Sequence, residues 1–362
     1  MGDAIKGRGS TGYLPGRYEV TVGEAVDDGW HDGRADLDEE IVEPLPRTQV
    51  REEFARSVIS RNKSPDIAFS QSVNPYRGCE HGCSYCFARP SHAYLNLSPG
   101  LDFETKLSAK VNAAEQLRRE LAKPGYKPST IALGINTDSY QPIERKWRIT
   151  RQLLEVLAET KHPVSLITKN ALIERDLDLL EPMARDHLVS VHFSVTSLDN
   201  RLAAKLESRA SAPHRRLKAI RALSERGVPV GVMFAPVIPW VNDKELEAVL
   251  EAARDAGARS AGYVLLRLPW EVAPLFKDWL QTHLPDRAEH VMSTIRQMRG
   301  GRDYDSTFGK RQTGEGPYAE LLAHRFALAL KRYGYPARGS FPGLETSKFV
   351  PPRPPSPQGE LF

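Results

Sequence analysis

The 362-residue sequence contains only three cysteines and no apolar run near the roughly 20 residues that a bilayer-spanning helix needs. Its first residues lack the apolar core of a signal peptide, so we expect a cytoplasmic protein without a membrane partner. A secreted disulfide scaffold would distribute an even number of cysteines along the chain, whereas these three lie within eight residues. In a reducing compartment such a cluster indicates metal binding.

The net charge of +4 is small but unevenly distributed. Residues 24–43 contain nine acidic residues and one basic residue, Arg34, and therefore carry −8, which leaves +12 on the rest of the chain. A basic body suits an anionic partner such as DNA. The same charges are equally compatible with lysines and arginines that only solvate helices.

From about residue 68 the sequence alternates between short β-rich runs and longer amphipathic stretches, which favours a parallel sheet with right-handed crossovers. Six strands are too few for an eightfold barrel, so we predict an open, partial α/β barrel with its chemistry at the C-terminal ends of the strands. The predicted strands are Ile67–Val73, Thr130–Asn136, Val164–Thr168, Leu188–Val195, Val228–Pro236 and Gly262–Leu266.

The predicted helices alternate with these strands, and the last of them has a cap at each end: Asn242 precedes it and Gly257 follows it. These helices are Ala109–Leu121, Arg145–Thr160, Ile173–Met183, Ala212–Arg226 and Asp243–Ala256, followed by Val272–Met298 and Tyr318–Tyr333. We therefore divide the chain into a polar N-terminal extension (1–60), the barrel (61–270), a helical and loop region (271–340) and a proline-rich tail (341–362).

The cysteines have the spacing C-x3-C-x2-C, at Cys79, Cys83 and Cys86. Three thiolates on one loop can bind three irons of a [4Fe–4S] cluster and leave the fourth iron open to a chelating ligand. The amino and carboxylate groups of S-adenosylmethionine (SAM) suit that position, and electron transfer into its sulfonium releases a 5′-deoxyadenosyl radical. The alternative is a structural zinc site of the Cys3His type, with His81 or His92 as fourth ligand.

The loop C-x3-C-x-aromatic-C resembles the signature of the radical SAM superfamily. Its flanking sequence, NPYRGCEHGCSYCFARPSHAYL followed by SPGLDFETKL, is similar to the branch related to spore photoproduct lyase. The similarity continues through TDSYQPIER, LITKN, SVTSLD, PVIPWVND, YVLLRLPWEV and GKRQTGEGPYAELLAHRF, and covers about residues 55–335. It implies a partial (β/α)6 barrel of radical SAM type that encloses SAM.

The resemblance also implies roles for individual residues beside the cluster ligands Cys79, Cys83 and Cys86. Purely structural alternatives stay open for several of them. Asp138 and Gln141 would then be a helix cap, Lys169 a surface lysine, and Ser194 and Thr196 hydroxyls at strand ends. The implied SAM-pocket residues are Tyr85 against the adenine, Asp138 and Gln141 after the second strand, Lys169 after the third, Ser194 and Thr196 after the fourth, and Ala235 and Pro236 after the fifth.

Two departures from the related branch bear on function. Photoproduct lyases use an additional cysteine as hydrogen-atom donor, and this chain has no fourth cysteine, so it does not carry out that reaction by that mechanism. The related proteins show Glu-Pro-Arg-Ala after the fourth strand, where this chain has the sequence Glu207-Ser208-Arg209-Ala210. The charged pair is kept, so we expect little functional change.

Two further segments suggest a nucleic-acid partner. Arg302, Tyr304, Lys310 and Arg311 belong to a glycine-rich loop in which cations beside aromatic rings suit phosphates and exposed bases, or else form a lid packed on the barrel. The tail ends in QGELF, which resembles the peptide by which repair proteins dock on the DNA sliding clamp. Its docking residues are Gln358, Leu361 and Phe362.

The sequence therefore predicts an enzyme that reductively cleaves SAM and acts on a substrate related to DNA. It requires a reducing electron donor of the flavodoxin or ferredoxin type. One alternative is the same radical chemistry on a protein or small molecule. The other is a non-catalytic nucleic-acid-binding module stabilised by zinc or an iron–sulfur cluster.

Overall fold

The central sheet contains six parallel strands, as the sequence predicted, and the computed structural model describes residues 5–19, 47–336 and 343–352. The strands follow one another across the sheet in chain order, because each crossover returns the chain to the next position. These strands are β3 (Gln71–Val73), β6 (Ile131–Leu133), β7 (Val164–Thr168), β8 (Val189–Ser194), β9 (Val230–Val237) and β10 (Ser260–Leu265).

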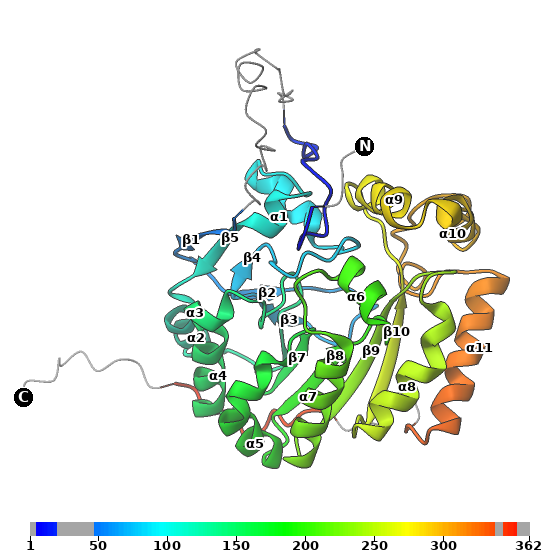
Figure 1. Ribbon diagram of the computed structural model, residues 1–362. Coiled ribbons are helices and arrows are strands. Elements are labelled where there is room, and N and C mark those ends of the chain that lie inside the picture. The colour runs from blue at the N-terminus through cyan, green and yellow to red at the C-terminus, as the bar shows by residue number, and fades with distance from the viewer. Residues whose placement is uncertain (1–4, 20–46, 337–342, 353–362) are drawn as a thin grey trace, which may run out of the picture.

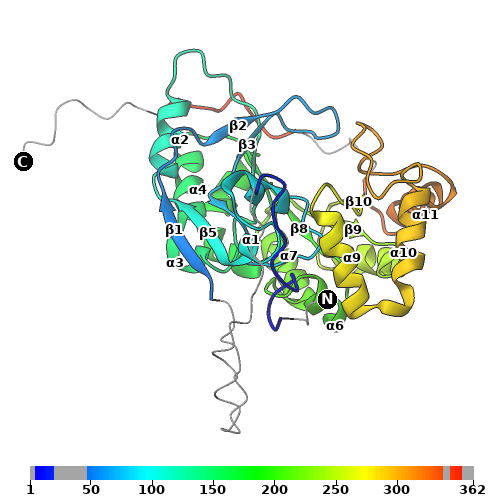
Figure 2. The same cartoon turned by 90° about the horizontal axis from the view of Figure 1, so that it is seen from above.

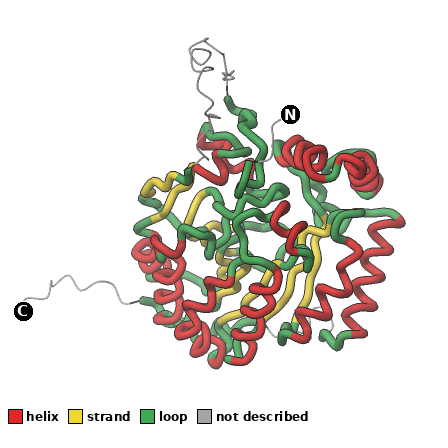
Figure 3. The backbone as a smooth tube through the Cα atoms, viewed as in Figure 1, coloured by secondary structure: helices red, strands yellow, loops and turns green. Residues whose placement is uncertain are grey.

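The sheet curves but stays open, with β10 at one edge and the short antiparallel strand β2 (Ile59–Arg61) at the other. Strands β7, β8 and β9 are rich in apolar residues because helices cover the outer face of the sheet and the other face lines the barrel interior (Figure 3). The covering helices are α2 (Ala113–Leu121), α4 (Ile149–Glu159), α5 (Leu177–Arg185), α7 (Pro213–Glu225), α8 (Leu246–Asp255) and α11 (Pro317–Arg332).

Further elements lie over the C-terminal ends of the strands, at the upper end in Figure 1. On one side a small sheet pairs β5 (Lys106–Lys110) with β1 (Gln49–Glu53) and β4 (Tyr76–Arg77). On the other side stand the helices α9 (Val272–His283) and α10 (Pro285–Gln297). The short helical elements are η2 (Arg89–Leu95), α1 (Asp102–Thr105), α3 (Glu144–Trp147), η3 (Ala171–Asp176), α6 (Asn200–Leu206) and η4 (Asp243–Glu245).

Several predicted helices have different bounds in the structure, and the helical region predicted at Val272–Met298 is divided into α9 and α10 at Leu284. The helix predicted at Ala109–Leu121 is wrong at its start, because Lys106–Lys110 pairs with β1 and β4 as strand β5. The helix predicted at Arg145–Thr160 is divided into α3 and α4 at Arg148, whose φ of +52° does not continue a helix. Local amphipathicity did not reveal either interruption.

The N-cap predicted at Asn242 is also wrong. Its amide nitrogen donates to the carbonyls of Thr196 and Pro236, at 2.7 and 2.9 Å, and its oxygen accepts from the backbone N–H of Ile238. The buried side chain therefore ties the ends of two strands together instead of capping η4. The chain does leave the helix at Gly257, whose φ is +100°.

The N-terminal extension contributes more structure than its polar composition indicated. Besides β1 and β2, residues 5–19 lie as a strap between α1 and α9 in both views (Figures 1 and 2). The buried carboxylate of Glu104 accepts hydrogen bonds from the backbone N–H groups of Gly9 and Ser10, at 3.0 and 2.9 Å. The acidic segment 24–43 lies outside the described residues, and the domain boundaries stay predictions.

Residues 343–352, inside the predicted tail, pack on the other end of the barrel. The ring of Phe349 meets the edge of His162, with 5.3 Å between ring centroids, and lies 5.5 Å from the ring of Tyr126. The backbone N–H of Val350 donates to the carbonyl of Thr160. No helix within 5–19, 47–336 or 343–352 has the length and apolarity that crossing a bilayer requires.

We expect acid to destabilise the fold through His162. Burial lowers the pKa of its imidazole from 6.5 to about 4. A histidine with a depressed folded pKa stabilises the protein fully above about pH 6.5, and this contribution is lost as the pH falls towards 4, by up to about 3 kcal/mol. Urea unfolding across this range should show a flatter profile for His162→Gln than for the exposed control His214→Gln. Parallel profiles of these two variants would contradict the assignment.

Candidate active site

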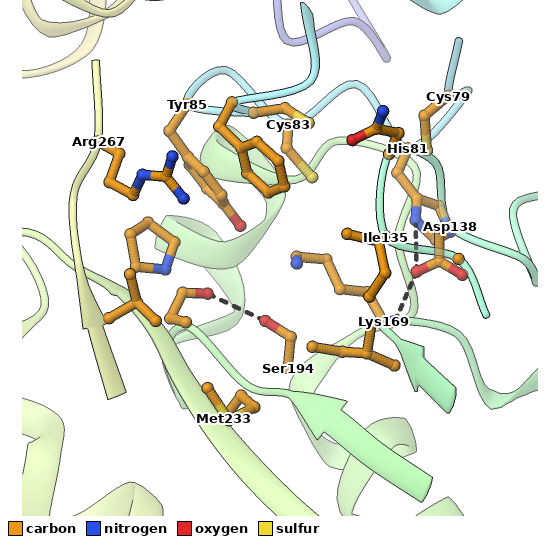
Figure 4. Close-up of a pocket in the computed structure, with 18 of the residues that line it drawn as sticks. Cys79, His81, Cys83, Tyr85, Ile135, Asp138, Lys169, Ser194, Met233 and Arg267 are labelled. Atoms are coloured by element: carbon orange, nitrogen blue, oxygen red, sulfur yellow. Dashed lines mark hydrogen bonds and ion pairs between the residues drawn. The ribbon is translucent and has the colours of Figure 1, made fainter. Parts of the chain in front are cut away.

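A pocket opens at the C-terminal ends of the barrel strands, beneath the loop that carries the three cysteines (Figure 4). It contains about 1020 Å3 of empty space, part of it open to solvent, which is at the large end for a small-molecule site. The predicted site residues that line it are Cys79, Cys83, Cys86, Tyr85, Asp138, Lys169, Ser194, Ala235 and Pro236. Gln141 and Thr196 are buried behind its wall.

The cysteine loop folds tightly at two glycines. Gly78 and Gly82 have φ values of +73° and +64°, which favour glycine, and an added Cβ at either position would approach other atoms within 3 Å. All three cysteines are free thiols; Cys79 and Cys83 are buried, and Cys86 is partly exposed. Both glycines therefore permit the close turn on which the cysteines lie.

Burial raises the pKa of Cys79 well above its ordinary value and that of Cys83 to about 12. A buried thiol of this kind becomes a thiolate when a cation such as iron replaces its proton. No three His, Cys, Asp or Glu side chains converge on one metal-ion position in the described part of the chain. A cubane places each cysteine on a different iron, so thiols spread around one loop fit it better than a single zinc.

The two histidines proposed as alternative zinc ligands have other partners. His81 Nδ1 lies 3.3 Å from a carboxylate oxygen of Asp138, and its Nε2 lies 3.3 Å from the amide nitrogen of Asn170. His92 Nε2 lies 3.0 Å from the carbonyl oxygen of Lys106, and this ring does not line the pocket. The donor set thus fits a three-cysteine cluster site.

Gln141 fixes the start of the cysteine loop. Its amide nitrogen donates to the carbonyl of Gly78 at 3.1 Å and to the hydroxyl of Thr137 at 2.8 Å. Its oxygen accepts from the backbone N–H of Glu80 at 2.8 Å. The side chain therefore positions the loop and does not line the pocket, and the contact with SAM that the resemblance implied stays a prediction.

Asp138 connects the second and third parallel strands below the cysteine loop. It accepts from the Thr168 hydroxyl at 2.7 Å and from the backbone N–H of Lys169 at 2.8 Å. Burial by itself would raise the pKa of this carboxyl, but attraction to His81 and these hydrogen bonds lower it to about 2. Asp138 also accepts a hydrogen bond from the backbone N–H of Tyr140, as a local cap would. Because it lines the pocket as well, capping is not its only role.

Lys169 lines the pocket, where it is half-buried, and is not an ordinary surface lysine. Its Nζ lies 5.9 Å from the centre of the Tyr85 ring, and no acceptor bonds it among residues 5–19, 47–336 and 343–352. Burial opposes its charge, but the nearby Cys83 and Glu207 more than offset this and raise the pKa of the ammonium group. The ammonium group of Lys169 therefore stays charged and can bind an anionic group of a ligand in the pocket.

A buried ion pair that sequence reasoning left without a role supports the opposite wall. Glu207 pairs with Arg216 and accepts hydrogen bonds from the hydroxyls of Tyr85 and Thr196. Arg216 also donates to the carbonyl of Ser194 at 2.8 Å. These bonds fix the ring of Tyr85 in the pocket wall and explain why Thr196 lies behind it. The Glu-Ser-Arg-Ala motif included Glu207 and could have indicated it as a functional residue, but no local sequence pattern indicated that Arg216 is its partner.

The pocket also contains residues that the sequence analysis did not single out. The Arg267 guanidinium stacks on the ring of Phe87, with 5.1 Å to the ring centre, and a further nitrogen lies 3.3 Å from the Tyr304 hydroxyl. In Figure 4, Arg267 lies across the pocket from Asp138 and Cys79. The pocket therefore has a cysteine side and an arginine side.

The cations of the glycine-rich loop are paired with carboxylates. Arg302 lies 3.9 Å from Asp305, Lys310 lies 2.9 Å from Glu315, and Arg311 forms an ion pair with Asp66. Tyr304 contacts Arg267, as described above. This arrangement favours the lid interpretation, while direct nucleic-acid contact by these residues stays a prediction. The clamp peptide at Gln358, Leu361 and Phe362 lies outside the described residues.

We expect Gly82→Ala to disrupt the cysteine loop. The added Cβ would lie 2.6 Å from a Glu104 carboxylate oxygen, and Arg89 holds that carboxylate in a buried ion pair, so it cannot easily move. The steric clash and the positive φ should together destabilise the protein by about 2–4 kcal/mol and reduce bound iron. Gly125→Ala is the matched control, because its φ is +76° but nothing lies within 4 Å. Urea unfolding and iron analysis should separate the two variants; equal behaviour would contradict this expectation.

An open parallel barrel with three free thiols above its strand ends defines a class of cluster-binding barrel enzymes. The chain belongs to the radical SAM superfamily, whose family model matches residues 73–253. This confirms the resemblance at the level of family and fold. Membership implies a [4Fe–4S] cluster and SAM as cofactors, and the reaction type is not assigned by it.

The chain is also similar to two uncharacterized proteins and to a solved structure. An uncharacterized protein of Mycobacterium tuberculosis is 37% identical over 277 residues, which cover 75% of this chain and 78% of that protein. An uncharacterized protein of Methanocaldococcus jannaschii is 26% identical over 191 residues, covering 53% of this chain and 68% of its own length. A spore photoproduct lyase mutant with bound AdoMet and dinucleoside spore photoproduct has the same fold, with a TM-score of 0.56, 13% identity, and coverage of 78% and 79% of the two chains.

Proposed function

We propose that this chain reductively cleaves SAM at a cluster held by Cys79, Cys83 and Cys86 and abstracts hydrogen from a nucleic-acid-related substrate. The observation that supports it most is that three free thiols and the half-buried Lys169 side chain line one pocket. A [4Fe–4S] cluster with an open iron supplies the electron that breaks a C–S bond of SAM.

The chain's own residues provide binding and orientation. Lys169 offers a half-buried cation in the pocket for the carboxylate of SAM. Asp138 keeps its negative charge and holds the backbone from which Lys169 projects. The ring of Tyr85 presents an apolar surface for the adenine and is fixed by the bond from its hydroxyl to Glu207. Charge interactions are stronger where the pocket side chains are shielded from solvent than they are in water.

Three observations support a substrate related to DNA. The chain outside residues 24–43 carries +12, which suits a phosphate backbone. A structural neighbour, spore photoproduct lyase, has been solved with a dinucleoside spore photoproduct. The last residues resemble a sliding-clamp peptide. Since the chain has no fourth cysteine, the substrate radical requires a hydrogen source other than a cysteine near the site.

Anaerobic incubation with SAM and a chemical reductant, followed by measurement of 5′-deoxyadenosine, tests the radical chemistry. A brown preparation with about four irons and four sulfides per chain should produce 5′-deoxyadenosine. A flavodoxin or ferredoxin should replace the chemical reductant. A colourless protein with one tightly bound zinc would instead indicate the non-catalytic binding module. A cluster-loaded enzyme that modifies only proteins or small molecules would refute the nucleic-acid substrate.

The clamp partner requires a separate measurement. Purified sliding clamp should be retained by the full chain and lost when Leu361 and Phe362 are removed. Retention by neither form would contradict this partner without affecting the radical chemistry.

A further inference from the structure

Four side chains from three distant segments form an exposed aromatic surface around one arginine. The Arg17 guanidinium lies 4.2 Å from the centre of the Trp270 ring, 5.1 Å from that of Tyr18 and 5.3 Å from that of Tyr94. The two tyrosine rings are themselves 5.1 Å apart. We call Arg17, Tyr18, Tyr94 and Trp270 the aromatic ledge.

The ledge is exposed although its rings are large. Trp270 and Tyr94 each have 66% of their surface accessible and Tyr18 has 49%, so none of these rings contributes much to the core. Isolated exposed aromatic rings need no explanation, but a contiguous group around a cation is a recognition feature.

The backbone at Trp270 is strained. Its φ is +46°, in a region that bulky residues rarely adopt. A side chain held outward in this conformation is typical of ligand-binding positions, where the surroundings maintain the strain. Glu271 contributes to this arrangement, since it accepts from the Arg17 backbone N–H at 3.3 Å and forms an ion pair with the Arg17 guanidinium at 3.6 Å.

The ledge is connected to the arginine side of the pocket. Trp270 follows Arg267 by three residues, which span at most about 10 Å of extended chain. Phe87, 42% exposed, carries the Arg267 guanidinium and belongs to the same segment as Tyr94. Phe87 therefore adds an exposed ring at the pocket lining, beside Arg267.

Arg267 provides the charge for an anionic ligand at this boundary. No carboxylate forms an ion pair with it in the described residues, and its buried Nε has no hydrogen-bond partner there. The nearby loop fixes it through Tyr304, while neighbouring Arg299 holds the carbonyl of Leu266 at 3.0 Å. The glycine-rich loop thus positions a pocket cation.

We propose that the aromatic ledge, with Phe87 and Arg267, binds a single-stranded nucleic acid whose bases stack on the rings and whose phosphate pairs with Arg267. This inference rests on the proposed function and specifies its substrate class and entry side. Flat rings bind bases of any sequence, and an unpaired guanidinium selects phosphate over a neutral peptide. A single strand fits better than a duplex, whose bases are stacked on one another and do not reach the rings.

The test is fluorescence anisotropy of a labelled single-stranded DNA oligonucleotide with the anaerobically reconstituted full chain. Trp270→Ala and Tyr94→Ala should each weaken binding about tenfold, as loss of one stacked base implies. The matched control is Trp240→Ala, since Trp240 is also an exposed tryptophan with positive φ, at 45% and +63°. It lies beside His290, with ring centroids 4.4 Å apart, and should change binding less than about twofold.

Equal dissociation constants for Trp270→Ala and Trp240→Ala would overturn the proposal. Equal competition by the same sequence as a duplex, or by polyglutamate, would also overturn it, because base stacking would then be unnecessary. The 5′-deoxyadenosine assay separates the two ideas. If the enzyme cleaves SAM but does not bind the oligonucleotide, the proposed radical function is supported and the proposed role of the aromatic ledge is refuted. A protein that binds the oligonucleotide without cleaving SAM has the opposite outcome.

Discussion

Replacement of Cys83 by alanine should reduce 5′-deoxyadenosine formation to the background level. Cys83 is one of three thiols on the pocket loop, and without it a second iron loses its protein ligand. The remaining two cysteines hold a cluster poorly, so iron and sulfide content should fall as well. Anaerobic turnover, iron analysis and sulfide analysis on the same preparation measure both consequences.

Ser84→Ala is the matched control for this variant. Its hydroxyl is buried on the same loop, and the described residues offer it no hydrogen-bond partner, so its removal leaves no new unsatisfied group. We expect wild-type cluster content and SAM cleavage. Full SAM cleavage by Cys83→Ala would contradict the assignment of this thiol, and circular dichroism would show whether a loss arises from unfolding.

Replacement of Arg216 by leucine should produce the largest loss of stability outside the cysteine loop. Its guanidinium pairs with the buried carboxylate of Glu207 and donates to the carbonyl of Ser211 at 2.7 Å. Removing one partner of a buried ion pair leaves an uncompensated charge, which costs about 3–5 kcal/mol. Urea unfolding of the apoprotein measures this change in the free energy of unfolding.

The adjacent Arg215→Leu is the control for this variant. Arg215 occupies the same helix, and its ion pair with Glu174, at 3.4 Å, is partly exposed with side chains 40% and 28% accessible. Leucine and arginine have similar helix propensities, so helix formation is affected alike. Exposed ion pairs contribute about 0–1 kcal/mol, and a similar loss in both variants would show that the buried network does not stabilise the wall.

The pocket wall links this stability to the site. Glu207 accepts from the hydroxyl of Tyr85 and pairs through its backbone with Cys83. The backbone N–H of Ser84 donates to the carbonyl of Leu206 at 3.1 Å. Arg216→Leu should therefore also reduce the amount of cluster bound at fixed iron concentration, because the loop loses its anchor.

Local sequence sufficed where a short segment carries its own physical signal. The spacing of Cys79, Cys83 and Cys86 indicated a cluster loop before any contact was known. The β-rich runs at β7 and β8, each followed by an amphipathic stretch, indicated strands of a parallel sheet. These features depend on neighbours within a few residues.

Other assignments failed because the deciding partner is remote in sequence. Ala109 and Lys110 were included in a predicted helix, yet backbone pairing with β1 places them in strand β5. Asn242 has the residue type of a helix cap, but two strand-end carbonyls compete successfully for its amide. Gln141 was expected in the pocket and instead holds the loop backbone.

The sequence by itself determined the three-cysteine loop and the six-stranded open barrel, because these follow from local spacing and periodicity, and it indicated the superfamily through the resemblance of its motifs. Only the tertiary structure showed that Lys169 is a half-buried cation in the pocket, that Glu207 and Arg216 support the pocket wall, and that Arg17 meets Trp270. Charge burial and ring stacking depend on which distant segments pack together, and the folded chain alone sets those distances.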